Sequence, residues 1–104
     1  MDLNLYAGNV LISSPGMHQM AGDIILLLQK QNANFVHIKA EYTTFSNGEI
    51  KPFIPETVRG MHAFLLHDLQ YPDPNVNLIQ MLLLADALKR ASVIGISLVI
   101  PYIP

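Results

Sequence analysis

The chain has 104 residues, a formal net charge of −2 at pH 7, a hydrophobic content of 51% and no cysteine. These figures predict a single globular domain and argue against a disordered segment, a basic surface for nucleic acid and any site that needs a thiolate. No apolar run approaches the ~20 residues of a membrane span and the N-terminus lacks the features of a secretory signal, so a cytoplasmic protein is expected.

The first third of the chain predicts a strand followed by a helix. Residues 3–7 alternate in polarity ahead of Gly8-Asn9, which favours an opening strand closed by a turn. Residues 17–31 are rich in helix formers, and the preceding Ser-Ser-Pro-Gly supplies a serine N-cap with proline behind it. The expected apolar face of this helix consists of Met20, Ile24, Leu27 and Leu28.

The middle of the chain predicts a strand and then a hairpin. Residues 35–38 form an apolar run typical of a strand. Residues 42–45 and 50–54 flank Asn47-Gly48, the strongest short signal for a β-hairpin. Because two prolines stand in or directly after the second arm, that arm should be an edge strand or end early.

The last third predicts a buried strand, a helix and another buried strand. Residues 61–66 are a continuous apolar run. Asp73 and Pro74 mark a helix start and Lys89-Arg90 its end. The expected apolar stripe of this helix consists of Leu78, Met81, Leu82, Ala85 and Leu88. Residues 96–100 then resemble a central parallel strand, and this order of elements indicates an α/β fold.

No common catalytic motif is present, since the chain contains no phosphate-binding glycine loop, nucleophile elbow or zinc-binding helix motif. Its four histidines are scattered, so packed or surface histidines are expected rather than a metal site. They are His18, His37, His62 and His67.

Two segments combine a structural interpretation with a functional one. Residues 45–49 are first of all a hairpin tip, but an exposed Phe45 beside Asn47 and Glu49 could stack on a nucleobase and bind its edge, and adenine would suit such a site. Residues 56–60 read as a surface loop with an ion pair. Alternatively, Arg59 and the Thr57 hydroxyl could grip a phosphate.

Several spaced motifs together resemble the N-terminal part of ribose-phosphate pyrophosphokinases, also called PRPP synthetases. In chain order they are Tyr6-Ala7-Gly8, Phe-Ser-Asn-Gly-Glu at 45–49, Thr-Val-Arg-Gly at 57–60, residues 77–92 and Val-Ile-Pro-Tyr at 99–102. The resemblance implies a three-layer α/β domain of the phosphoribosyltransferase type, Rossmann-like, with a mostly parallel sheet and a protruding β-hairpin. Residues 1–104 would be a truncated N-terminal domain, incomplete at its C-terminus.

The resemblance also implies an activity and its sites. Members of the family transfer the diphosphate of Mg-ATP to the 1-hydroxyl of ribose 5-phosphate, making PRPP for nucleotide biosynthesis, and assemble as homo-oligomers such as hexamers. By the family's pattern, Phe45, Asn47 and Glu49 contact the adenine of ATP in a neighbouring subunit. The places of a phosphate or ADP effector site are held here by Thr57, Arg59, Ala91 and Ser92.

The family's catalytic residues are expected outside this chain. Its segment for the ATP phosphates would begin directly after Pro104, and the Mg²⁺ ligands, the catalytic loop and the ribose-phosphate loop would follow. The resemblance therefore places no catalytic or metal-binding residue in the chain, which would be inactive alone. The alternatives left open are a non-catalytic regulatory subunit of the synthetase-associated type and, less favoured, a free-standing small α/β module.

Overall fold

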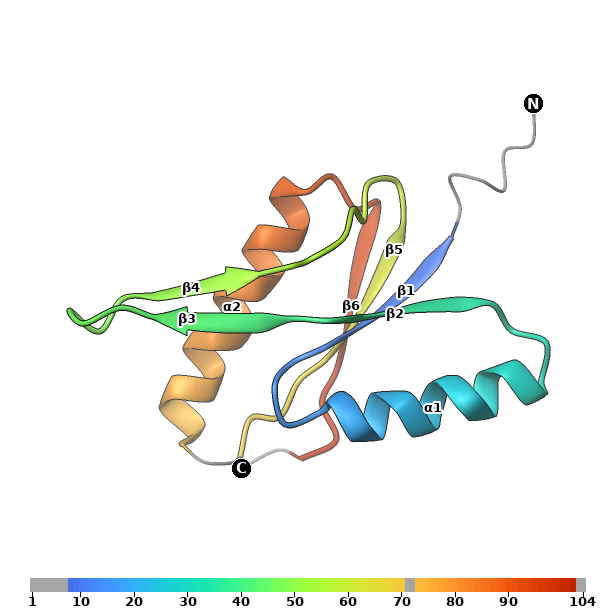
Figure 1. The fold of residues 1–104 in the computed structure, drawn as a ribbon, viewed down its shortest axis with the longest axis horizontal. Helices are drawn as coiled ribbons and strands as arrows, with labels where there is room; N and C mark the ends of the chain where they lie inside the picture. The colour runs from blue at the N-terminus through green and yellow to red at the C-terminus, as the bar shows by residue number, and fades with distance from the viewer. Residues whose placement is uncertain (1–7, 71–72, 103–104) are drawn as a thin grey trace.

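The computed structural model of the chain describes residues 8–70 and 73–102. These residues form a sheet, two helices and a hairpin, arranged as Figure 1 shows. The elements are β1 (Asn9–Ser13), α1 (His18–Lys30), β2 (Phe35–Lys39), β3 (Glu41–Thr44), β4 (Ile50–Phe53), β5 (His62–Leu66), α2 (Pro74–Arg90) and β6 (Gly95–Val99).

The main sheet is parallel and has the strand order β2-β1-β5-β6. Its central strand β1 pairs on both sides, so that Val10 lies opposite Val36 in β2 and opposite Ala63 in β5. The expectation of a central position for residues 96–100 is wrong for the described sheet, because β6 is an edge strand. As an edge strand it is only partly covered: Ile96 packs against the core, while Leu98, on the same face of the sheet, remains 48% exposed.

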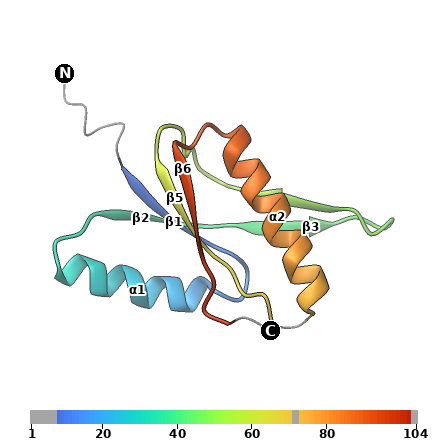
Figure 2. The same ribbon diagram turned by 180° about the vertical axis from the view of Figure 1, so that it is seen from behind.

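The two helices cover opposite faces of this sheet (Figures 1 and 2), which confirms a three-layer α/β arrangement. Successive strand residues point to opposite faces, so neighbours in one strand join different cores. On the α2 side the buried residues are Val10, Ile12, Ile38, Ala63, Leu65, Met81, Leu84 and Leu88, together with Ala40 and Val58. On the α1 side they are Leu11, Met17, Ala21 and Leu66, with Phe35 and Phe64 packed against them.

The hairpin was predicted correctly and protrudes from the body (Figure 1). Its strands β3 and β4 form a separate antiparallel sheet, and β3 follows β2 after the single buried residue Ala40. The side chains of Tyr42 and Ile54 pack against the core, and β4 lies beside α2. As expected from its prolines, β4 is short and ends at Phe53.

The start of the chain differs from the expectation. The strand predicted over residues 3–7 lies outside the described residues, and the predicted turn at Gly8-Asn9 is wrong, because β1 begins at Asn9. The apolar run that follows Asn9 is short, but it is buried on both faces, as a central parallel strand requires. No serine caps α1: its N-cap is Met17, which makes no side-chain cap hydrogen bond, because a turn at Gly16 (φ +91°) intervenes.

The helix bounds were predicted well, and the buried faces only in part. The side chain of Asp73 caps α2 by accepting a hydrogen bond from the Asn75 backbone N–H at 2.9 Å, as expected. The buried residues of α2 are Asn77, Met81, Leu84 and Leu88, whereas Leu78 and Leu82 of the predicted stripe are exposed. In α1, Leu27 is likewise exposed. Neither helix of the described ranges has the length and apolar character to cross a membrane.

Candidate functional site: the hairpin and the ends of the strands

The hairpin tip is held by three short hydrogen bonds. The backbone N–H of Phe45 donates to the Glu49 carbonyl at 2.8 Å, and that of Gly48 donates to the Phe45 carbonyl at 2.8 Å. The Glu49 N–H donates to Oδ1 of Asn47 at 3.0 Å, which closes a side-chain turn. Gly48 has φ +88°, a conformation that glycine adopts without strain. The sequence Asn-Gly therefore fixes the shape of the tip.

The tip presents groups that suit a nucleobase. The Phe45 ring is 46% exposed, and Asn47 and Glu49 are exposed as well. Because the turn uses the carbonyl oxygen of Asn47, the side-chain NH₂ group is the donor that this residue offers outward. An aromatic face, an amide donor and a carboxylate acceptor match the face, the ring nitrogens and the amino group of adenine. The structural and functional interpretations of residues 45–49 are thus compatible.

At the hairpin base, the Tyr42 hydroxyl connects three elements. It donates to the Gln80 carbonyl of α2 at 3.0 Å and lies 2.8 Å from Nε2 of His67, which follows β5. Nδ1 of His67 is 2.9 Å from the Asp68 carbonyl oxygen. Burial raises the pKa of the Tyr42 phenol and lowers the pKa of the His67 imidazole, the latter opposed by the hydrogen bond and the charge of Asp68. The phenol therefore keeps its proton and acts as a donor.

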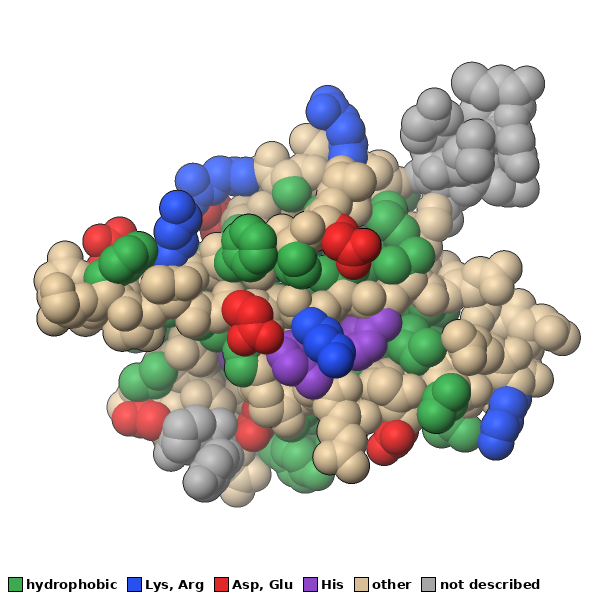
Figure 3. Space-filling view, in the orientation of Figure 1, with side chains coloured by type: hydrophobic (Ala, Val, Ile, Leu, Met, Phe, Trp, Pro, Cys, Tyr) green, Lys and Arg blue, Asp and Glu red, His purple; other side chains and the backbone are tan. Residues whose placement is uncertain are grey.

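A second hydrogen-bonded group joins β1, α1, β2 and β3. Oγ of the buried Ser13 lies 2.7 Å from Nδ1 of His18 and 2.9 Å from Nε2 of His37, and Nε2 of His18 lies 3.2 Å from Oε1 of Glu41. The pKa of His37 is lowered by burial and then by the charges of Lys39 and His18. Figure 3 shows histidine side chains near the middle of the face that is in view, next to a basic and an acidic side chain.

All four histidines are hydrogen-bonded within the part of the chain that the structure describes. Within residues 8–70 and 73–102, no group of three or more His, Cys, Asp or Glu side chains could hold a metal ion. The remaining histidine, His62, lies 2.8 Å through Nε2 from Oγ of Ser97. Each histidine therefore has a hydrogen-bonding partner, as packed histidines commonly do.

The loops that carry the other predicted residues lie side by side. The Gly60 N–H donates to the Ser92 carbonyl at 3.0 Å, and the Ile94 N–H donates to the Met61 carbonyl at 2.9 Å. These bonds join the two loops that carry the predicted residues, all of which are exposed: Thr57, Arg59, Ala91 and Ser92. The loops precede β5 and β6, and Figure 1 shows them away from the hairpin tip. The structure thus forms two separate candidate sites.

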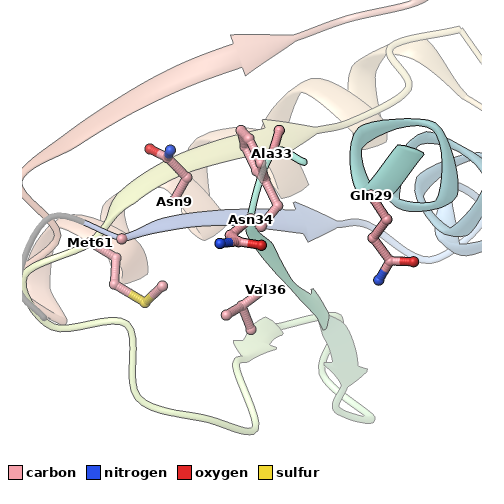
Figure 4. Close-up of a pocket in the computed structure, with 8 residues that line it drawn as sticks. Asn9, Gln29, Ala33, Asn34, Val36 and Met61 are labelled. Atoms are coloured by element: carbon pink, nitrogen blue, oxygen red, sulfur yellow. The ribbon is translucent and has the colours of Figure 1, made fainter. Parts of the chain in front are cut away.

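Two hollows of the surface contain none of the predicted residues. Figure 4 shows one of about 230 Å³ at the amino ends of β1 and β2, lined by neutral amides and apolar groups. The residues labelled there are Asn9, Gln29, Ala33, Asn34, Val36 and Met61. The other, of about 300 Å³, lies between β4 and α2 and has Lys51 and Arg90 in its wall. Arg90 is paired with Asp86 one helical turn away, so its charge is already compensated.

Sequence reasoning missed both hydrogen-bonded groups at the hairpin base. Their members lie far apart in the chain, as with Ser13 and His37 or Tyr42 and His67. One signal was available: in a parallel sheet, the residues that end neighbouring strands meet at one edge. Ser13 ends β1 and His67 follows β5, the strand that pairs with it.

Comparison with known proteins gives a family. The family profile described as the N-terminal domain of ribose phosphate pyrophosphokinase matches residues 10–104, and the resemblance at Tyr6-Ala7-Gly8 lies outside that match. Ribose-phosphate pyrophosphokinase 1 of Listeria monocytogenes is 44% identical over 64 residues, which cover 62% of this chain and 20% of the relative. The enzyme of the same name from Streptococcus pyogenes is 47% identical over the same shares. The matched region thus spans about a fifth of the length of these relatives.

Solved structures share the fold at low sequence identity. A hypoxanthine-guanine phosphoribosyltransferase of L. donovani superimposes with a TM-score of 0.72 at 10% identity, over 90% of this chain and 53% of that one. A hypoxanthine phosphoribosyltransferase of Trypanosoma cruzi gives 0.69 at 14% identity, over 90% and 50%. The fold is therefore of the phosphoribosyltransferase type. Together with the profile match over residues 10–104, this shows that the chain belongs to the family of ribose-phosphate pyrophosphokinase N-terminal domains.

Proposed function

We propose that this chain is the part of a ribose-phosphate diphosphokinase that binds the adenine of ATP through its hairpin tip. The enzyme would transfer the diphosphate of Mg-ATP to the 1-hydroxyl of ribose 5-phosphate and so make PRPP for nucleotide biosynthesis. The observation that carries the proposal is the tip itself, where a half-exposed Phe45 and the exposed side chains of Asn47 and Glu49 share one turn. Family membership supplies the reaction, and the tip geometry supplies this chain's role in it.

In this role Phe45 stacks on the base, while Asn47 donates to a ring nitrogen and Glu49 accepts from the amino group. The tip protrudes beyond the body of the chain (Figure 1), so a base bound to it lies against a second surface. We place that surface on a neighbouring subunit of a homo-oligomer. Each hairpin would then complete the ATP site of its neighbour.

The chemistry of diphosphate transfer needs orientation of two anionic substrates and compensation of phosphate charge, rather than a strong base. Mg²⁺ supplies that compensation when it is bound. The described residues offer no metal-binding cluster, so we assign Mg²⁺ and the ribose 5-phosphate site to other residues of the enzyme. The described part of the chain contributes binding energy at the base, and by itself it is expected not to turn over substrate.

The paired loops are proposed as a phosphate or ADP effector site. Arg59 supplies a guanidinium, and Thr57 and Ser92 supply hydroxyl groups, all exposed. The backbone bond from Gly60 to Ser92 keeps the loops together without a ligand. Ala91, also exposed, places only a methyl group next to Ser92.

A coupled assay for PRPP formation from ATP and ribose 5-phosphate tests the proposal. The assay uses the full-length gene product, first in a cytoplasmic extract and then after purification. Turnover that falls when Phe45 is replaced by alanine, with KM for ATP raised and KM for ribose 5-phosphate unchanged, supports it. Equal effects on both substrates would contradict the adenine role. Absence of turnover with ATP binding retained would assign instead a non-catalytic regulatory subunit.

A further inference from the structure

The hairpin makes few polar contacts with the body of the chain, although β4 lies beside α2. Strands β3 and β4 share no backbone ladder with the main sheet. Most of the side chains on its two arms are exposed, including Thr43, Thr44, Lys51 and Phe53. A two-stranded ribbon of this kind is only marginally stable by itself. Its angle to the body is therefore set by the packing of β4 beside α2 and by the contacts near its base.

Tyr42 makes two of those contacts. Its hydroxyl donates to the Gln80 carbonyl of α2 at 3.0 Å and lies 2.8 Å from Nε2 of His67. Across the other face of β3, Glu41 reaches Nε2 of His18 at 3.2 Å, but this carboxylate is largely exposed and its bond is weaker. In the described residues, no other side chain of β3 or β4 hydrogen-bonds to the body of the chain.

We propose that Tyr42, through His67 and Gln80, is a positioning residue for the tip; this inference rests on the proposed adenine role. Phe45 lies three positions after Tyr42, which at about 3.4 Å per residue is roughly 10 Å. A tilt of roughly 10° about Tyr42 would move the Phe45 ring by about 2 Å over that length. Such a displacement is enough to lose stacking on a base held by another surface.

The first test measures the direction of the hairpin without any substrate. This chain contains no cysteine, so nitroxide labels can be attached through Ser46→Cys at the tip and Lys30→Cys at the end of α1, in the full-length gene product with any cysteine elsewhere in it replaced by serine. We expect Tyr42→Phe to broaden the distance distribution between the labels. The matched control is Thr43→Val, which removes a hydroxyl from the next, exposed residue of the same strand. Equal widths in both variants would overturn the inference.

The second test measures the consequence for ATP. Loss of the hydroxyl, with its contacts to Gln80 and His67, should raise KM or Kd for ATP about three- to tenfold and leave KM for ribose 5-phosphate unchanged. Thr43→Val should change neither constant. A Tyr42→Phe protein that loses kcat and both affinities together would show a general structural role and contradict positioning.

If Tyr42→Phe folds poorly, variants of His67 test the same contact from its other side. A glutamine at this position can keep a polar atom near the Tyr42 hydroxyl, whereas the shorter asparagine cannot reach it. His67→Gln should therefore retain a narrow label distribution and His67→Asn should broaden it. If Phe45→Ala leaves ATP binding intact, the adenine role fails, while the label distances still decide whether Tyr42 positions the hairpin.

Discussion

His62 lies directly over Gly95 in the sheet: a Cβ atom on Gly95 would come within 2.9 Å of Nδ1 of His62. The two residues are register partners in β5 and β6, and the ring is held in place by Ser97 at 2.8 Å and by the ring of Phe64, whose centroid is 4.6 Å away. Gly95 is therefore required by the neighbouring imidazole.

Replacing Gly95 by alanine should destabilise the chain by about 1 to 3 kcal/mol, because the ring has to leave its bonded position. Chemical denaturation monitored by circular dichroism measures the effect. Gly22→Ala is the control, since nothing lies within 4 Å of the added atom and alanine favours a helix. An equally stable Gly95→Ala protein would show that His62 moves aside without cost.

The cap of α2 gives a second expectation. Asp73→Ala removes the acceptor of the Asn75 N–H and should cost about 1 kcal/mol. Asp86→Ala removes only the exposed pair with Arg90 and should cost about 0.5 kcal/mol or less. Urea unfolding of both variants tests the order, and a larger effect at Asp86 would contradict it.

The buried histidines predict a pH dependence of folding. The pKa values of His67 and His37 are lowered in the folded chain, so the unfolded chain binds protons more readily. The free energy of unfolding should then be greatest above the ordinary histidine pKa of 6.5 and should fall as pH drops below it towards the lowered values.

Urea titrations between about pH 8 and about pH 5.5 measure this fall. A double variant, His37→Gln with His67→Gln, should lose much of the difference between the two pH values. If its stability fell as steeply as that of the parent chain, other groups would be responsible.

The exposed side of α2 predicts self-association. Leu78, Ile79 and Leu82 are 43%, 53% and 58% exposed on one side of the helix, and apolar groups clustered in this way favour association. Light scattering of the isolated chain should therefore give a mass above that of a monomer. Ile79→Gln with Leu82→Gln should lower that mass and leave the helical circular dichroism unchanged. A monodisperse monomer in the parent chain would contradict the expectation.

Local sequence signals predicted most elements of this fold, but not β1, which begins at Asn9 where a turn was expected. Asn47-Gly48 located the hairpin tip and Asp73-Pro74 located the start of α2, because each motif satisfies backbone groups within a few residues. The faces of the helices were harder. In α2 the sheet and the hairpin select Leu84 and leave Leu82 in solvent, a choice that depends on tertiary contacts rather than on spacing.

The candidate sites likewise include residues that the sequence could identify and residues that it could not. The tip residues could be proposed from their own sequence, since the turn itself makes Phe45 exposed. The contact between Tyr42 and His67 could not, because it joins segments 25 residues apart and depends on the angle at which β3 leaves the sheet. Short polar contacts of this kind become visible only when the strands have been placed.

Pro52 has a consequence for the free edge of the hairpin. The bond from Phe45 to Glu49 makes that pair a hydrogen-bonded one, and pairs alternate along an antiparallel ladder, so Tyr42 and Pro52 form a non-hydrogen-bonded pair. The proline nitrogen therefore faces outward, where any other residue would offer an N–H. A strand from another molecule that approached β4 would find that donor missing. The protruding hairpin can thus reach toward another surface with its tip while its side resists edge-to-edge aggregation.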